Sequence, residues 1–254
     1  YVLLTYFGIN PLVALPFAAV LFFAVGYVLY YLLIPRLAHS DEPETASFLL
    51  MFGVSLMIVS VLTWIFEADV RPINFSFDPI NVLLYTVENG YGEGRDAKVL
   101  VPTARLVALA INALIIVALT WFFYRTLPGK AMRAAIMNRE AVQIVGIDIH
   151  RLSATAFGLA ASLAAVTGVL LTLVVPSIDP NGGADLTLIG FIVIALGGLG
   201  HPVGALAAGI IFGLVEQVSN VMLPQAAAQM LGFMILVAVI FFKPSGLFGL
   251  ERGR

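Results

Sequence analysis

Of the 254 residues in the chain, 61% are hydrophobic and only 11% are charged, and the mean hydropathy is +1.02. Charged residues make up about a quarter of a soluble domain, so this composition excludes an ordinary soluble protein and indicates a polytopic membrane protein. The chain has no cysteine and three histidines, so neither a disulfide nor a catalytic metal or thiol centre is expected.

The apolar runs predict the membrane spans, since a helix needs about 20 apolar residues to cross the hydrocarbon core. The chain opens at Tyr1 without the features of a signal peptide, and we expect native N-terminal spans to be missing. About seven runs follow, of which the fifth is too short to cross unaided: residues 11–34, 46–66, 103–124, 152–175, 186–196, 203–223 and 226–242. The sequence therefore predicts an all-α, polytopic transmembrane helical bundle, with residues 1–254 as a single domain.

The polar stretches predict the orientation of the spans. Residues 67–101 contain six acids and three bases, and Asn89-Gly90 between two β-rich runs predicts a short hairpin at the membrane surface. Lys and Arg accumulate in cytoplasmic loops. Placing residues 126–151 in the cytoplasm puts nine of the thirteen basic residues there. Residues 67–101 and the loop 177–185 then lie outside, and the C-terminus lies inside.

Residues 126–151 are the charged interruption between long apolar runs in the second half of the chain. Asn138 is a favourable helix N-cap, and Gly146 suits the left-handed position after a helix end. We therefore predict a short amphipathic helix over residues 139–145. Its polar face would hold Arg139, Glu140 and Gln143, and its apolar face would hold Ala141, Val142, Ile144 and Val145. The alternative is a solvated connector that simply obeys the positive-inside rule.

The order of residues 140–146, Glu-Ala-Val-Gln-Ile-Val-Gly, resembles the Glu-Ala-Ala…Gly loop of ABC importer permeases, with Val142 where a second Ala is often found. Further motifs, spread over about half the chain, resemble the permease family for branched-chain amino acids and related amides. They are Gly129-Lys-Ala-Met-Arg-Ala134, Asn138-Arg-Glu140, Gly146-Ile147, the stretch from Phe157 to Leu171, Gly197-Gly-Leu-Gly200 with Gly204-Ala205, and Lys243-Pro-Ser-Gly-Leu-Phe-Gly249.

The resemblance implies a permease subunit of an ATP-driven importer in the bacterial inner membrane, working by alternating access, and not an enzyme. It implies that residues 126–151 are a cytoplasmic coupling segment in which Arg139, Glu140, Ala141 and Gly146 contact the ATPase. No Gly-x-x-x-x-Gly-Lys-Ser/Thr loop occurs. ATP and Mg²⁺ would thus be held by two ATP-binding cassette subunits, with no cofactor in this chain. The other implied partners are a second homologous permease or a second copy, an extracytoplasmic solute-binding protein and membrane lipid, with no nucleic acid.

Two features are candidates for the translocation path. Gly197, Gly198 and Gly200 interrupt the chain beside the short run, as in the broken helices of transport pathways, although close helix packing explains glycines equally well. Glu216 is an ionisable residue within a span, or near enough to its outer end to reach interfacial water. Three alternatives stay open: an ABC permease for urea, short amides or a pentose sugar; an ion-coupled secondary transporter using Glu216; and a membrane anchor that transports nothing.

Overall fold

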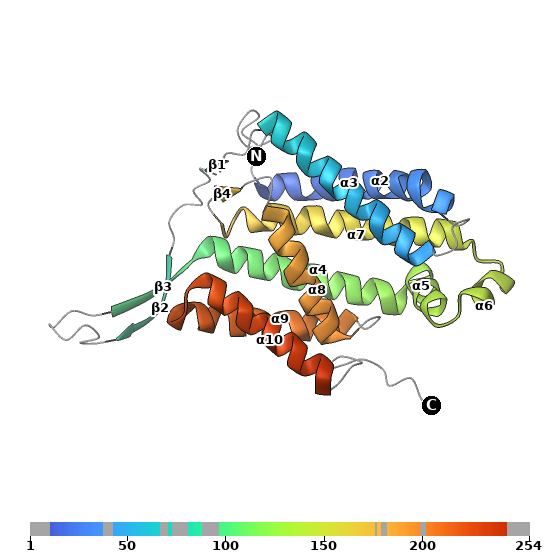
Figure 1. Cartoon of the computed structure of the whole chain (residues 1–254). Helices are drawn as coiled ribbons and strands as arrows, with labels where there is room; N and C mark the ends of the chain where they lie inside the picture. Colours follow the sequence, from blue (N-terminus) through green and yellow to red (C-terminus); the bar gives the residue numbers. More distant parts are fainter. Residues whose placement is uncertain are drawn as a thin grey trace. The chain divides into compact units, whose positions relative to one another are not determined.

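The computed structural model describes residues 11–37, 43–66, 71–72, 81–87, 97–175, 177–178, 182–198 and 202–242 (Figure 1). The helices are α2 (Pro11–Leu37), α3 (Pro43–Phe66), α4 (Thr103–Arg125), α5 (Leu127–Met137), α6 (Arg139–Ile144), α7 (Ile149–Leu171), α8 (Gly182–Gly197), α9 (Pro202–Met222) and α10 (Gln225–Phe242). The strands are β1 (Arg71–Pro72), β2 (Asn81–Val87), β3 (Ala97–Pro102) and β4 (Ser177–Ile178).

Each predicted apolar run is a helix, which confirms the all-α polytopic bundle. Among the described residues, five helices are long and apolar enough to cross a membrane: Pro11–Pro35, Thr45–Phe66, Thr103–Arg125, Ile149–Leu171 and Gly204–Met222. The short fifth run corresponds to α8, which has 16 residues and ends at Gly197. The first helix extends through Pro35 to Leu37, slightly beyond the predicted span. The chain is therefore a multi-pass membrane protein.

The chain divides into two compact units, Tyr1–Pro180 and Asn181–Arg254. In the first unit, α2 packs along α7. A Cβ atom on Gly26 would lie 2.7 Å from the Ala161 Cβ, and one on Gly158 would lie 2.9 Å from the Phe23 carbonyl oxygen. Glycines allow helix backbones to approach closely in lipid, where no hydrophobic force draws helices together. This contact joins two helices that are far apart in the sequence.

Two antiparallel strand pairs lie in the first unit. Strands β2 and β3 pair from Asn81 with Pro102 to Val87 with Ala97, with an irregularity between Leu83 and Tyr85. This confirms the predicted hairpin, whose turn, including Asn89-Gly90, lies outside the described residues. The pair β1–β4 places Arg71 opposite Ile178. The stretch after α3 thus meets the segment after α7, which agrees with their predicted position on one side of the membrane.

The second unit contains α8, α9 and α10. The end of α8 packs closely on the start of α9, because a Cβ atom on Gly197 would lie 2.6 Å from both the backbone N and the Cα of Ala205. The next residue, Gly198, has a φ of +91°, a conformation that glycine adopts without strain. The predicted chain break after the short run is confirmed by this left-handed glycine. Gly200, which belongs to the same predicted cluster, lies outside the described residues.

Candidate functional site

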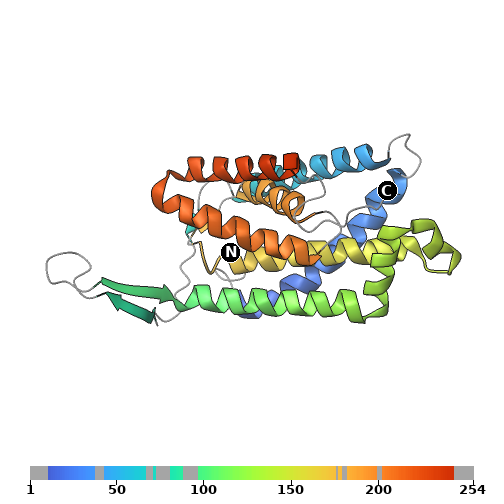
Figure 2. The same ribbon diagram turned by 90° about the horizontal axis from the view of Figure 1, so that it is seen from below.

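The charged segment folds into two helices, α5 and α6, between the end of α4 and the start of α7 (Figures 1 and 2). Both views show them at the opposite end of α4 from the β2–β3 hairpin. The sequence predicted α6 but not α5, whose 11 residues follow α4 after a single intervening residue. The charged segment is thus folded into helices that follow α4 directly and lead into α7.

Thr126 sets the turn from α4 into α5. Its hydroxyl donates to the Phe122 carbonyl at 2.7 Å, and the same oxygen accepts from the Gly129 amide at 3.2 Å, so it caps α5. Gly129 is buried against the last turn of α4, where a Cβ atom would overlap the Phe122 carbonyl and lie 2.7 Å from the Phe123 Cα. The signal for this turn is Thr-Leu-Pro-Gly, since Pro is favoured near a helix start.

Arg133 fastens α5 to the end of α4. Its Nε donates to the Phe123 carbonyl at 3.1 Å, and its guanidinium lies 4.3 Å from the centre of the Tyr124 ring. The carbonyls of the last turn of a helix have no partner within the helix, and a cation is favourable beside them. Arg133 therefore joins α5 to the last turn of α4 by a hydrogen bond and a cation–π contact.

Helix α6 has the predicted cap at each end. The Asn138 side-chain oxygen accepts from the Ala141 amide at 3.0 Å. At the other end Gly146 has a φ of +86°, its amide donates to the Gln143 carbonyl at 2.9 Å, and the Ile147 amide donates to the Val142 carbonyl at 3.2 Å. These two bonds form a Schellman motif. The helix ends at Ile144, one residue earlier than predicted.

Only part of the predicted apolar face of α6 is buried. Val142 has 5% of its surface exposed, whereas Ile144 and Val145 are 86% and 78% exposed. Of the four residues that the prediction placed on this face, Ala141, Val142, Ile144 and Val145, only Val142 is buried. A helix of six residues has fewer than two turns, so few of its side chains can be buried against the neighbouring helices.

The predicted coupling residues share this exposed helix. Arg139, Glu140 and Ala141 are exposed on α6, and Gly146 is exposed directly after it. The structure therefore brings together the four residues that the resemblance singled out. Their contact with another protein stays a prediction.

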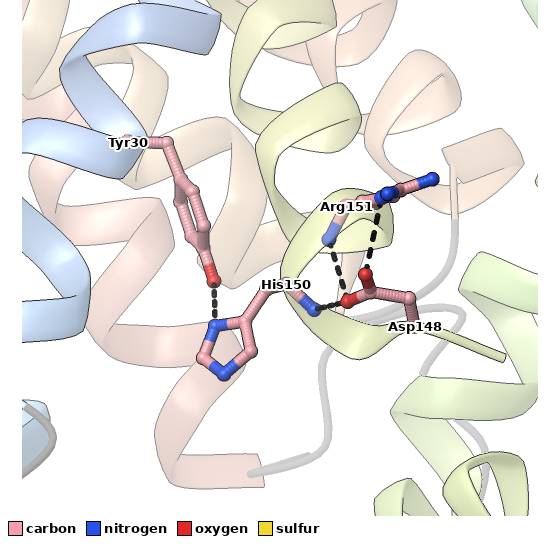
Figure 3. A network of polar contacts seen from close by, with 4 residues as sticks. All are labelled: Tyr30, Asp148, His150 and Arg151. Carbon is pink, nitrogen blue, oxygen red and sulfur yellow. Dashed lines mark hydrogen bonds and ion pairs between the residues drawn. The ribbon is translucent and has the colours of Figure 1, made fainter.

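A polar network joins the end of the segment to α7 and α2 (Figure 3). The Asp148 carboxylate caps α7, accepting from the His150 amide at 2.9 Å and the Arg151 amide at 3.1 Å, and it pairs with the Arg151 side chain at 3.2 Å. The buried Tyr30 of α2 has its hydroxyl 3.5 Å from Nδ1 of His150. This network was not predicted from the sequence, although an Asp just before an apolar run is a recognisable helix start.

The path candidates lie in the second unit. Gly197 is beside Ala205 near the start of α9, and Glu216 is half-buried about three turns further along that helix. The structure does not bring them together. One turn beyond Glu216, the buried Asn220 side-chain oxygen has no hydrogen-bond partner within the described residues. Gly197 has a packing role, and a role of either candidate in transport stays a prediction. No group of three or more His, Asp or Glu able to hold a metal occurs among the described residues.

Comparison with known proteins gives one family. The family described as "Branched-chain amino acid transport system / permease component" matches residues 1–240. The high-affinity branched-chain amino acid transport system permease protein LivH of Escherichia coli K12 is 30% identical over 172 residues, which is 66% of this chain and 56% of that protein. The probable LivH of Methanocaldococcus jannaschii is 27% identical over 263 residues, which is 98% of this chain and 78% of that protein.

A more distant likeness is to the ribose import permease protein RbsC of Haemophilus influenzae, 24% identical over 196 residues, 74% of this chain and 57% of that protein. The chain spans little more than half the length of the E. coli LivH protein. No solved structure matches it significantly. The family match covers nearly the whole chain, including α4 to α7 and α8 to α9. The chain belongs to the family of permease components of branched-chain amino acid transport systems.

Proposed function

We propose that the chain is a permease subunit of an ATP-driven importer in the bacterial inner membrane, which moves branched-chain or related amino acids by alternating access. The family and the names of the LivH relatives support the substrate class. The exposed, doubly capped helix α6 is the observation on which the coupling to ATP rests.

The surface of α6 suits a partner protein. Met137, Ile144 and Val145 are each at least 78% exposed, outside the helices that can cross the membrane. Apolar side chains grouped on an exposed surface mark interaction sites. The partner is an ATP-binding cassette subunit, which would hold ATP and Mg²⁺, since this chain has no nucleotide-binding loop of its own.

The contacts of α6 and its neighbours can transmit a displacement of α6 to the membrane helices. Val142 is the buried residue of α6, Arg133 joins α5 to α4, and Asp148 caps α7. In turn α7 packs along α2. A displacement of α6 by the ATPase would therefore move α4 and α7, the membrane spans on either side of α5 and α6.

The remaining partners follow from this arrangement. A second homologous permease or a second copy of this chain would complete the translocation path, and two ATPase subunits would act on the pair. An extracytoplasmic binding protein would deliver the solute on the side of the membrane where the β2–β3 hairpin lies. The hairpin is at the opposite end of α4 from α6.

Site-specific cross-linking tests the docking surface. The chain has no cysteine, so single-cysteine variants have no background. Ile144→Cys carrying a photoreactive maleimide should cross-link to the ATPase subunit. Trp64→Cys is the matched control, since Trp64 is 85% exposed near the far end of α3. Equal cross-linking at both positions, or none at position 144, would overturn the docking role of α6.

Transport in liposomes tests the whole proposal. With the ATPase subunits and the binding protein present, labelled leucine should accumulate only with ATP, and collapse of the proton gradient should not stop it. Loss of uptake on that collapse would instead favour an ion-coupled transporter, and no flux under any condition would favour a membrane anchor. The likeness to RbsC makes a pentose permease the second candidate, so labelled ribose is the matched solute.

A further inference from the structure

A groove of about 430 Å³ lies between α4, α5 and α7 in the first unit, and it reaches the start of α6. Its walls include Leu119 and Phe123 of α4 and Ala156, Leu159 and Leu163 of α7. Arg139 also lines it, at the end where α5 joins α6. We name this space the α4–α7 groove.

The groove lies at the depth of one membrane leaflet. Its long wall is α7, and one turn of α4 lies opposite; both helices can cross the membrane, whereas α5, which closes one end with Met132, Ala135 and Ile136, is not among the spans. Along α7 the lining extends from Ile149 to Leu163, a rise of about 20 Å. The hydrocarbon core is about 30 Å thick, so the groove covers at least its cytoplasmic half. In the orientation proposed above, its apolar walls would face the chains of the inner-leaflet lipids.

The shape of the groove favours a hydrocarbon chain over a protein helix. Spread over a rise of about 20 Å, a volume of about 430 Å³ gives a mean cross-section of roughly 20 Å². A helix with its side chains is about 10 Å wide and needs roughly 80 Å². A single methylene chain, in contact with its neighbours at about 4 Å, fits the narrower section.

The charge at the mouth of the groove is positive. Arg139 lines the groove itself, and Arg133 lies close by, held against Tyr124. Asp148 is paired with Arg151. Among residues 125–151 there are five Lys or Arg and two Asp or Glu. A cluster of basic residues at the cytoplasmic end of membrane helices attracts anionic headgroups.

We propose that the α4–α7 groove binds one acyl chain of an anionic phospholipid of the cytoplasmic leaflet, with Arg139 contacting the phosphate. The lipid would fill the space between α4 and α7, the two membrane spans that flank the α5–α6 segment. It would thus act as a bound lipid rather than as one of the exchanging lipids around the protein. This inference does not depend on the ATPase or on the solute.

A photoreactive lipid tests it. The full chain is placed in phosphatidylcholine nanodiscs that contain a phosphatidylglycerol with a diazirine in its acyl chain. After illumination, labelled peptides are mapped by mass spectrometry. Labelling should concentrate on the groove walls of α4 and α7. Unlabelled phosphatidylglycerol should compete, and unlabelled phosphatidylcholine should not.

Two pairs of variants sharpen the test. Arg139→Gln should lower the labelling about fivefold, the effect of losing about 1 kcal/mol from one interfacial charge. Arg125→Gln removes an exposed charge that does not line the groove, so the labelling should change little. Ala156→Phe should block the groove, whereas Ala118→Phe, on an exposed part of α4 outside it, should not.

Labelling spread evenly over the exposed faces of α4, or competed equally by both lipids, would overturn the proposal in favour of ordinary surrounding lipid. Labelling unchanged in both Arg139→Gln and Ala156→Phe would do the same. If Ala156→Phe does not fold, as judged by gel filtration and circular dichroism, the surface variant Arg139→Gln decides the question alone.

Discussion

Gly26 of α2 and Gly158 of α7 lie in contact where their helices cross: a Cβ atom on Gly26 would stand 3.1 Å from the Gly158 Cα. The atoms around both glycines include backbone, which cannot rotate out of the way. In a bilayer, close packing of this kind is a main source of attraction between helices. The crossing therefore holds α7, the membrane helix that follows α6, against α2.

Gly26→Ala should destabilise the protein. The added methyl would meet the Ala161 Cβ at 2.7 Å, and overpacking of this kind costs about 1–3 kcal/mol. The free energy of unfolding in mixed micelles measures the effect. Gly168→Ala is the matched control on α7, since no atom lies within 4 Å of its Cβ position. Equal stability of the two variants would contradict the close crossing.

Gly146→Val should reduce transport without preventing insertion. No atom lies within 4 Å of a Cβ added at this position, so there is room for a side chain. The φ of +86°, however, strains any residue that has a side chain, by about 1–3 kcal/mol. The C-terminal end of α6 should unwind. Leucine uptake, normalised to the membrane content of the protein, is the measurement. Gly146→Asn should lose less, because Asn tolerates this conformation; uptake by the Val variant at the native rate would argue against a coupling role.

Asn138→Ala should loosen the start of α6. The variant loses the acceptor for the Ala141 amide, and an N-cap is worth about 1 kcal/mol. Hydrogen exchange at the amides of residues 140–143 should speed up about fivefold. Asn138→Ser keeps a capping oxygen and should retain most of the protection. If exchange is the same in both variants, the cap contributes nothing.

Glu140→Lys should weaken co-purification of the ATPase subunit. Glu140 is exposed in the first turn of α6, where a negative charge is favourable by about 0.3–1 kcal/mol. The reversal therefore changes both the docking surface and the helix end. Glu140→Gln removes the negative charge without adding a positive one, so a smaller loss of co-purified ATPase subunit is expected. Co-purification of the Lys variant at the native yield would count against α6 as the docking surface.

Gly197→Val should disrupt the α8–α9 contact. Its Cβ would overlap the backbone of Ala205 and Gly204, with the closest atoms at 2.6 to 2.7 Å. We expect lower thermal stability in detergent and loss of uptake. Gly190→Val is the control in the same helix, with no atom within 4 Å of its Cβ position. A Gly197 variant that loses transport but keeps native stability would show a role in the path beyond packing.

Local chemistry made parts of this structure predictable from the sequence. An apolar run of about 20 residues has few other ways to satisfy its backbone in a bilayer, so the membrane helices follow from composition. The caps at Asn138 and Gly146 act within a few residues of the chain, so the bounds of α6 could be placed to within one residue. The hairpin of β2 and β3 follows from a turn signal between β-rich runs in the same way.

Tertiary structure decided which side chains meet. The crossing of Gly26 with Gly158 and the approach of Tyr30 to His150 join segments more than 100 residues apart, and no local pattern encodes such pairs. Nor could the sequence show that Val142 is buried while Ile144 and Val145 are exposed, because that depends on the angles at which the neighbouring helices α5 and α7 pack against α6. The sequence by itself determined the helices, their caps and the family motifs, whereas only the packing of the helices against one another determined which surface of α6 is exposed and where the groove between α4 and α7 opens.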